Sequence, residues 1–102
     1  MSAREELELT DIIVPMRMTF EQAGRQIEPG INLLHIDGWH KYEAVSRDFK
    51  LFKPLLAPQA HVMFHDVFSY YRGMRLFWHL ISWRYPSYLI PYGNGLGIIQ
   101  MP

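Results

Sequence analysis

The stretch INLLHIDGWHKYEAV, residues 31–45, is the part of the chain that decides how the fold is interpreted. Its first six residues form a near-continuous apolar run, which is typical of a strand covered on both faces. Asp37 and Gly38 end this run, and apolar residues at helical spacing begin after His40. The stretch therefore predicts a strand at 31–36 followed by a helix, with Asp37 and His40 in the connection.

A second apolar run, at 61–65, ends in a similar way, in His65 and Asp66. In an open parallel sheet, ligands bind beyond the carboxyl ends of the strands. If the two strands are neighbours, Asp37 and Asp66 converge at one edge of the sheet and His40 borders the same space. Two carboxylates with a histidine suit a hard divalent ion such as Mg²⁺. They equally suit a general base that a carboxylate orients.

The rest of the chain alternates between helix and strand patterns. Late in the helix that follows residue 40, Pro54 predicts that the last turn is a separate bend. Asn94-Gly95 predicts a hairpin between the last two strands. This order predicts an α/β fold in one domain, residues 1–102, with a mostly parallel sheet and an antiparallel hairpin at its C-terminal end. The expected helices cover 3–9, 20–27, 41–56 and 74–81, and the expected strands cover 11–16, 31–36, 61–65, 88–91 and 96–101.

Two of these helices also carry predictions about burial. The apolar stripe on the last helix predicts a face in the core, made by Met74, Phe77, Trp78 and Ile81. The segment RDFK, residues 47–50, predicts a solvated helix face.

Composition excludes several classes of protein. The ten basic and ten acidic residues give a formal net charge of zero, which argues against binding to nucleic acid through net charge. Zero net charge also favours self-association. The chain has no cysteine, so neither disulfides nor thiolate chemistry are expected. No apolar run is long enough to cross a membrane, and no signal-peptide pattern opens the sequence. We therefore expect a soluble, cytoplasmic protein.

Three segments together resemble the C-terminal half of class I S-adenosylmethionine-dependent methyltransferases, nearest to the macrolide-sugar and related O-methyltransferases. These segments are LLHIDGWHKYEAVSRDFKLFKPLLAPQAHVMFHD, GMRLFWHL and GNGLGII. The resemblance implies a Rossmann-like sheet, S-adenosylmethionine as cofactor and a small-molecule hydroxyl as acceptor. It also implies metal coordination by Asp37 and Asp66, with His65 in the first position of the family's acidic pair, and a general-base role for His40.

The resemblance stops short of the family's cofactor site. No glycine-rich turn stands between a strand and a helix, and no matching acid for the cofactor ribose is present; GNGLG lies in the expected hairpin. The resemblance therefore implies a truncated fold: either a partner chain or a swapped second copy supplies the missing half, or the sequence is a fragment or a degenerate relative. The chain by itself is not expected to turn over S-adenosylmethionine.

Three functions remain open at this point. The first is a metal-dependent O-methyltransferase that a partner completes. The second is a catalytically inactive assembly module, and the third is a domain that binds a metal or a small ligand without transfer chemistry. Each site residue also has a structural interpretation: Asp37 as a helix-capping loop acid, His40 as a solvated residue, and His65 as a donor to a backbone carbonyl. Three aromatic residues either line an acceptor pocket or serve packing: Trp39, Tyr70 and Tyr71.

Overall fold

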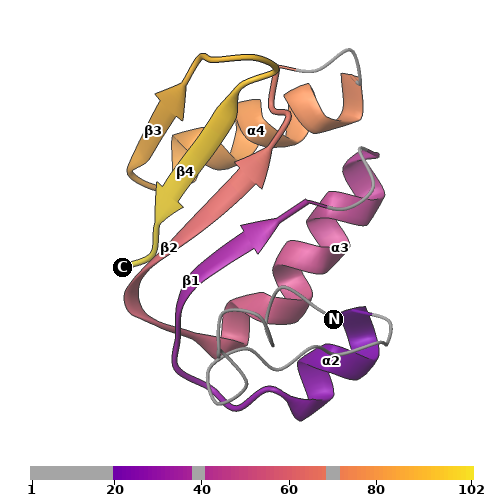
Figure 1. The fold of residues 1–102 in the computed structure, drawn as a ribbon, viewed down its shortest axis with the longest axis vertical. Helices are drawn as coiled ribbons and strands as arrows, with labels where there is room; N and C mark the ends of the chain where they lie inside the picture. Colours follow the sequence, from indigo (N-terminus) through magenta and orange to yellow (C-terminus); the bar gives the residue numbers. More distant parts are fainter. Residues whose placement is uncertain (1–19, 38–40, 69–71) are drawn as a thin grey trace, which may run out of the picture.

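A computed structural model describes residues 20–37, 41–68 and 72–102, and these residues form one four-stranded sheet with helices packed against it (Figure 1). The predicted helix at 3–9 and strand at 11–16 lie outside these residues. The described elements are α2 (Phe20–Gln26), β1 (Ile31–Ile36), α3 (Tyr42–Phe52), the 3₁₀ turn η1 (Lys53–Leu55), β2 (Leu56–His65), α4 (Arg72–Arg84), β3 (Ser87–Ile90) and β4 (Leu96–Gln100).

The sheet has the strand order β1-β2-β4-β3. β1 and β2 are parallel neighbours, with Ile36 paired to Phe64, and β4 runs antiparallel to both β2 and β3. A parallel pair needs a crossover connection, and α3 supplies it. The α/β class, the parallel pairing of 31–36 with 61–65 and the antiparallel end of the sheet are confirmed.

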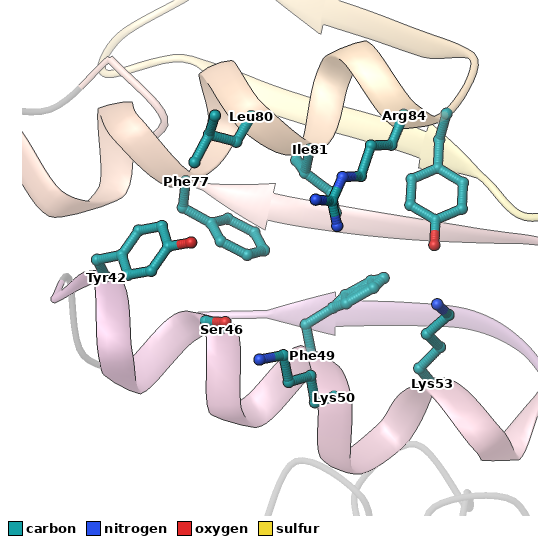
Figure 2. A pocket seen from close by; sticks show the side chains of 10 residues that line it. Tyr42, Ser46, Phe49, Lys50, Lys53, Phe77, Leu80, Ile81 and Arg84 are labelled. Atoms are coloured by element: carbon teal, nitrogen blue, oxygen red, sulfur yellow. The ribbon is translucent and has the colours of Figure 1, made fainter.

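The core lies between the sheet and the helices α3 and α4, which stand side by side over β2 (Figure 2). Phe64 of β2 is fully buried and forms its centre. The rings of Phe49, Phe77 and Trp78 surround it, at centroid distances of 5.7, 5.1 and 6.4 Å respectively. The predicted core stripe on α4 is confirmed, because all four of its residues are buried.

Short connections hold the ends of the sheet in place. Pro54 lies in η1, so the predicted bend at the end of α3 is confirmed. The β3–β4 hairpin is confirmed as well: the backbone N–H of Gly95 donates to the carbonyl of Tyr92 at 3.0 Å, and Gly95 has a positive φ of 84°. A left-handed backbone at this position explains the glycine.

Three expectations are wrong. The strand at 31–36 is not covered on both faces, since Ile36 is its one buried residue and Leu33 is 61% exposed. β2 begins at Leu56 and not at 61, because backbone pairing with β1 starts at Ile31 opposite Leu56. Asp48, in the segment expected to be solvated, is buried at 5% exposure, and this burial raises the pKa of its carboxyl above the ordinary value.

None of the helices within the described ranges is both long and apolar enough to cross a membrane.

Candidate functional site

The carboxyl ends of β1 and β2 lie side by side. Because Ile36 pairs with Phe64 in the parallel ladder, the residues that follow them, Asp37 and His65, project at the same level. Successive side chains on a strand alternate between faces. Ile36 and Phe64 point into the core under the helices, so Asp37 and His65 emerge on the other side of the sheet.

Asp66 joins these two residues through an unusual backbone. Its φ is +60°, a left-handed conformation that aspartate tolerates better than most residues. The hairpin holds the following backbone: the N–H of Val67 donates to the carbonyl of Gly95 at 3.2 Å, and that of Phe68 to the carbonyl of Asn94 at 2.7 Å. The β3–β4 turn therefore fixes the turn that carries Asp66.

The three side chains form a compact cluster. Nδ1 of His65 lies 3.0 Å from Oδ1 of Asp66 and 3.6 Å from Oδ1 of Asp37. One ligand atom from each residue lies within 4.8 Å of the other two. The side chains of Asp37 and His65 are about half exposed, at 55% and 47%, whereas that of Asp66 is 17% exposed. The cluster is thus open to solvent and anchored on the Asp66 side.

The charge on the cluster depends on His65. The hydrogen bond to Asp66 is the main cause that raises the pKa of the His65 imidazole above its ordinary value, and the negative charges of Asp66 and Asp37 add to it. Partial desolvation opposes the rise. A proton on Nδ1 therefore bridges the cluster at mildly acid pH.

The same three donors fit a divalent cation. Two carboxylate oxygens and one imidazole nitrogen are a ligand set that Mn²⁺ accepts readily, and Mg²⁺ accepts the carboxylates with water completing its shell. A metal and the bridging proton compete for the same Nδ1 atom, because a ligating histidine must be neutral.

The structure brings together three of the four predicted site residues: Asp37, His65 and Asp66. The fourth, His40, lies outside the described residues, as do Trp39, Tyr70 and Tyr71. Asp37 does not cap the following helix, because the N-cap position of α3 is Lys41 and no side-chain bond caps it there. The structural interpretation of Asp37 as a helix cap is therefore wrong.

His35 is a neighbour of the cluster that sequence reasoning missed. Its ring centroid lies 5.8 Å from that of His65. The period of two along a strand was the available signal, since it puts His35 on the same face as Asp37.

The family comparison matches the model of a methyltransferase domain to residues 2–67, which is more than half of the chain. This segment contains β1, α3 and β2 and all three cluster residues. A curated relative, the uncharacterized protein y4gI of Sinorhizobium fredii, is 38% identical over 87 residues. That match covers 82% of this chain and 10% of the relative.

Two solved structures share the fold. The SAH-bound Podospora anserina methyltransferase PaMTH1 has a TM-score of 0.77 at 13% identity, and the match covers 98% of this chain and 53% of that one. A methyltransferase from Geobacter sulfurreducens has a TM-score of 0.68 at 19% identity, covering 97% of this chain and 51% of that one. The chain thus spans about half the length of these structural neighbours and a tenth of the curated relative.

Proposed function

Because this chain belongs to the methyltransferase-domain family, we propose that it is the acceptor-side half of an S-adenosylmethionine-dependent O-methyltransferase. The observation that carries the proposal is the convergence of Asp37, His65 and Asp66 at the carboxyl ends of β1 and β2. Ligands bind at this edge in open α/β sheets. The SAH-bound state of the Podospora anserina neighbour supports the cofactor, since S-adenosylhomocysteine is what remains when S-adenosylmethionine gives up its methyl group.

In this proposal, the cluster holds a divalent metal. Asp37 and Asp66 supply carboxylate oxygens, and neutral His65 supplies Nδ1. A metal bound there lowers the pKa of an acceptor hydroxyl that coordinates it. The half-exposed side chains of Asp37 and His65 leave a side of the cluster open for the acceptor. His40, three residues after Asp37, is the base that takes the hydroxyl proton.

The cofactor half of the site comes, in this proposal, from a second polypeptide chain. A partner chain or a second, swapped copy are the two sources we consider. The lengths of the structural neighbours, of which this chain spans about half, support this division. The chain alone is accordingly expected not to turn over S-adenosylmethionine.

Calorimetric titration tests the metal part of this proposal. Mn²⁺ and Mg²⁺ are titrated separately into the 102-residue chain near pH 8, where the bridging proton on His65 competes least. We expect one ion per chain with a dissociation constant in the millimolar range or below. Asp37→Asn and Asp66→Asn should each weaken Mn²⁺ binding about tenfold or more, since each removes a charged ligand. Glu43→Gln, an exposed acid on α3, is the control and should bind as the unchanged chain does.

The cofactor part is tested by a second titration. S-adenosylmethionine is added with and without saturating Mg²⁺, and methyl transfer to small hydroxyl acceptors is assayed in parallel. The chain alone should show neither tight cofactor binding nor turnover. Micromolar affinity of the isolated chain for S-adenosylmethionine would contradict the division of the site.

A non-catalytic assembly module is the second candidate function. The exposed apolar residues on the sheet face away from α3 and α4, among them Leu33 and Tyr88, favour it. The metal titration separates the two candidates: a chain that binds no divalent ion at millimolar concentration contradicts the metal-dependent enzyme and favours the assembly module.

A further inference from the structure

A cavity lies between α3 and α4, away from the carboxylate cluster. It has a volume of about 250 Å³ and shares no residue with Asp37, His65 or Asp66. We call it the α3–α4 groove (Figure 2). Its lining comes from both helices, the first residue of η1 and the residue after α4: Tyr42, Ser46, Phe49, Lys50, Lys53, Phe77, Leu80, Ile81, Arg84 and Tyr85.

The floor of the groove is aromatic and apolar. Phe49, Phe77 and Ile81 are exposed by only 4, 5 and 9%. These residues are part of the hydrophobic core, and the core therefore forms the bottom of the groove. The rings of Tyr42 and Phe77 meet edge to face at 6.1 Å between centroids, close to the start of α3. A flat apolar ligand would therefore find ring edges and faces at this end of the groove.

The other end of the groove is cationic. Lys53 and Arg84 point into the space between the helices from opposite sides, and Lys50 lines the groove on the α3 side (Figure 2). Lys53 Nζ also lies 5.8 Å from the centre of the Tyr85 ring. None of the residues that line the groove is acidic, and within the described parts of the chain no carboxylate is paired with any of these three cations.

The helix ends account for only part of this positive charge. Lys50 and Arg84 lie in the last turns of α3 and α4, where cations offset the helix dipole. Each helix C-terminus carries roughly half a negative charge, so the two ends together balance about one of the three cations. The groove keeps an excess of positive charge next to an apolar floor.

We propose that the α3–α4 groove binds a single-ring aromatic anion, an aryl phosphate or aryl carboxylate. Size supports one ring: a dry cavity of about 150 Å³ accommodates benzene, so about 250 Å³ leaves room for one anionic group and little more. The ring lies on Phe49 and Phe77, and the anionic group meets Arg84 and Lys50. The hydroxyl-bearing side chains of Tyr42, Ser46 and Tyr85 also line the groove.

Titration with matched probes tests the proposal. Phenyl phosphate, benzoate, inorganic phosphate and benzyl alcohol are each added to the 102-residue chain, and binding is followed by backbone amide NMR shifts and by calorimetry. Phenyl phosphate and benzoate should bind at millimolar concentration or below, with the largest shifts in Ser46, Lys50 and Ile81. Inorganic phosphate and benzyl alcohol, which carry only the charge or only the ring, should bind at least tenfold more weakly.

Substitutions locate the site. Arg84→Gln and Lys50→Gln should each weaken phenyl phosphate about tenfold, whereas Arg75→Gln, an equal charge change at an exposed position on the same helix, should change it less than twofold. Asp37→Asn should leave phenyl phosphate binding unchanged, which separates this inference from the proposed metal site. Equal binding of inorganic and phenyl phosphate, or equal losses in Arg75→Gln and Arg84→Gln, would overturn the proposal. Unchanged thermal unfolding of each variant confirms that its fold is intact.

Discussion

The Nδ1 atom of His65 lies 3.0 Å from the Oδ1 atom of Asp66, the next residue in the chain. Neighbouring side chains on a strand point to opposite faces, so two adjacent residues seldom meet in this way. The contact exists because the backbone leaves the strand at Asp66, whose φ is +60°. The turn that ends the strand is therefore also what brings the two side chains together. The same His65 nitrogen lies 3.6 Å from Oδ1 of Asp37.

This contact predicts how His65 titrates. Asp66→Asn removes the largest cause of the raised pKa, so the pKa of the imidazole should fall toward its ordinary value of 6.5. Asp37→Asn should lower the same pKa by less, because the charge of Asp37 is the smallest of the causes that raise it. Titration of the imidazole proton resonances by NMR measures the pKa of His65 in the unchanged chain and in the two variants. A larger fall in Asp37→Asn than in Asp66→Asn would contradict the assigned order.

The same pair predicts how stability varies with pH. A raised folded-state pKa means that the folded chain holds the His65 proton more tightly than the unfolded chain does. This contribution is fully present below pH 6.5, the ordinary value, and is lost as pH rises through the folded pKa. Urea unfolding should therefore give a lower free energy of unfolding at about pH 8.5 than at about pH 5.5. The His65→Gln variant, measured alongside, should lack this part of the change.

Replacing Phe64 by alanine tests the centre of the core. Its ring is fully buried and contacts the rings of Phe49, Phe77 and Trp78. Removing a ring from such a site costs about 3–5 kcal/mol of unfolding free energy. That is a large share of the total for a domain of this size. Tyr92→Ala removes a ring that is 89% exposed and should change the free energy by less than about 0.5 kcal/mol. Urea unfolding followed by far-UV circular dichroism measures both variants.

Gly97 is required because of Trp78. A Cβ at position 97 would lie 2.5 Å from the Cζ3 atom of the indole, closer than real atoms approach. Gly97→Ala should destabilise the chain by about 1–3 kcal/mol, as overpacking does. Trp78→Leu removes the obstructing ring, so the alanine should cost much less in that background. A double-mutant cycle by urea unfolding measures this coupling, and additive effects of the two substitutions would show that the ring is not the cause.

Local patterns were enough to predict the elements, and tertiary pairing decided their limits. The helical spacing and Pro54 predicted where α3 would end, because both act within one turn. The start of β2 was missed, because Pro58 in APQA indicates a loop. The strand nevertheless reaches Leu56, which pairs with Ile31 beyond a register shift, and Gln59 within that irregular stretch has a φ of 63°. The apolar run at 31–36 does not reveal whether one face or two are covered, since that depends on neighbours elsewhere in the chain.

The position of the candidate site was predictable from local patterns, but the contacts within it were not. Strand-end position placed Asp37 and Asp66 on one edge, since parallel neighbours have level carboxyl ends. It did not reveal that His65 would bridge them, because that contact depends on the left-handed backbone of Asp66. The α3–α4 groove could not be predicted at all, because its lining residues come from both helices and share one cavity only after the helices pack.

Self-association follows from the face of the sheet that α3 and α4 leave uncovered. Backbone pairing aligns His35, Met63, Ile98 and Tyr88 in one row across all four strands. Met63 lies between the core residues Val62 and Phe64, so the whole row points away from the helices. Exposed apolar surfaces of this kind mark interaction sites.

The edge of the sheet adds to this tendency. Among the described strands, β1 is an outermost one, and its Leu33 is 61% exposed. An outer strand with apolar residues and few charges is a template for pairing with another chain. Zero net charge removes the repulsion that would keep two copies apart. We therefore expect a dimer or a larger assembly with an apolar interface that includes Leu33 of β1.

Light scattering at high micromolar concentration measures the assembly, and Leu33→Lys tests where the interface lies. A lysine at this exposed position costs a monomer little, but in an apolar interface it places an ammonium group out of water. Leu33→Lys should therefore raise the dissociation constant about tenfold or more. Trp83→Lys, at an 82% exposed position on α4, should leave it unchanged, because that surface is not part of the sheet face. A stable monomer would mean that the uncovered face is tolerated in water, and equal effects of the two lysines would place the interface elsewhere.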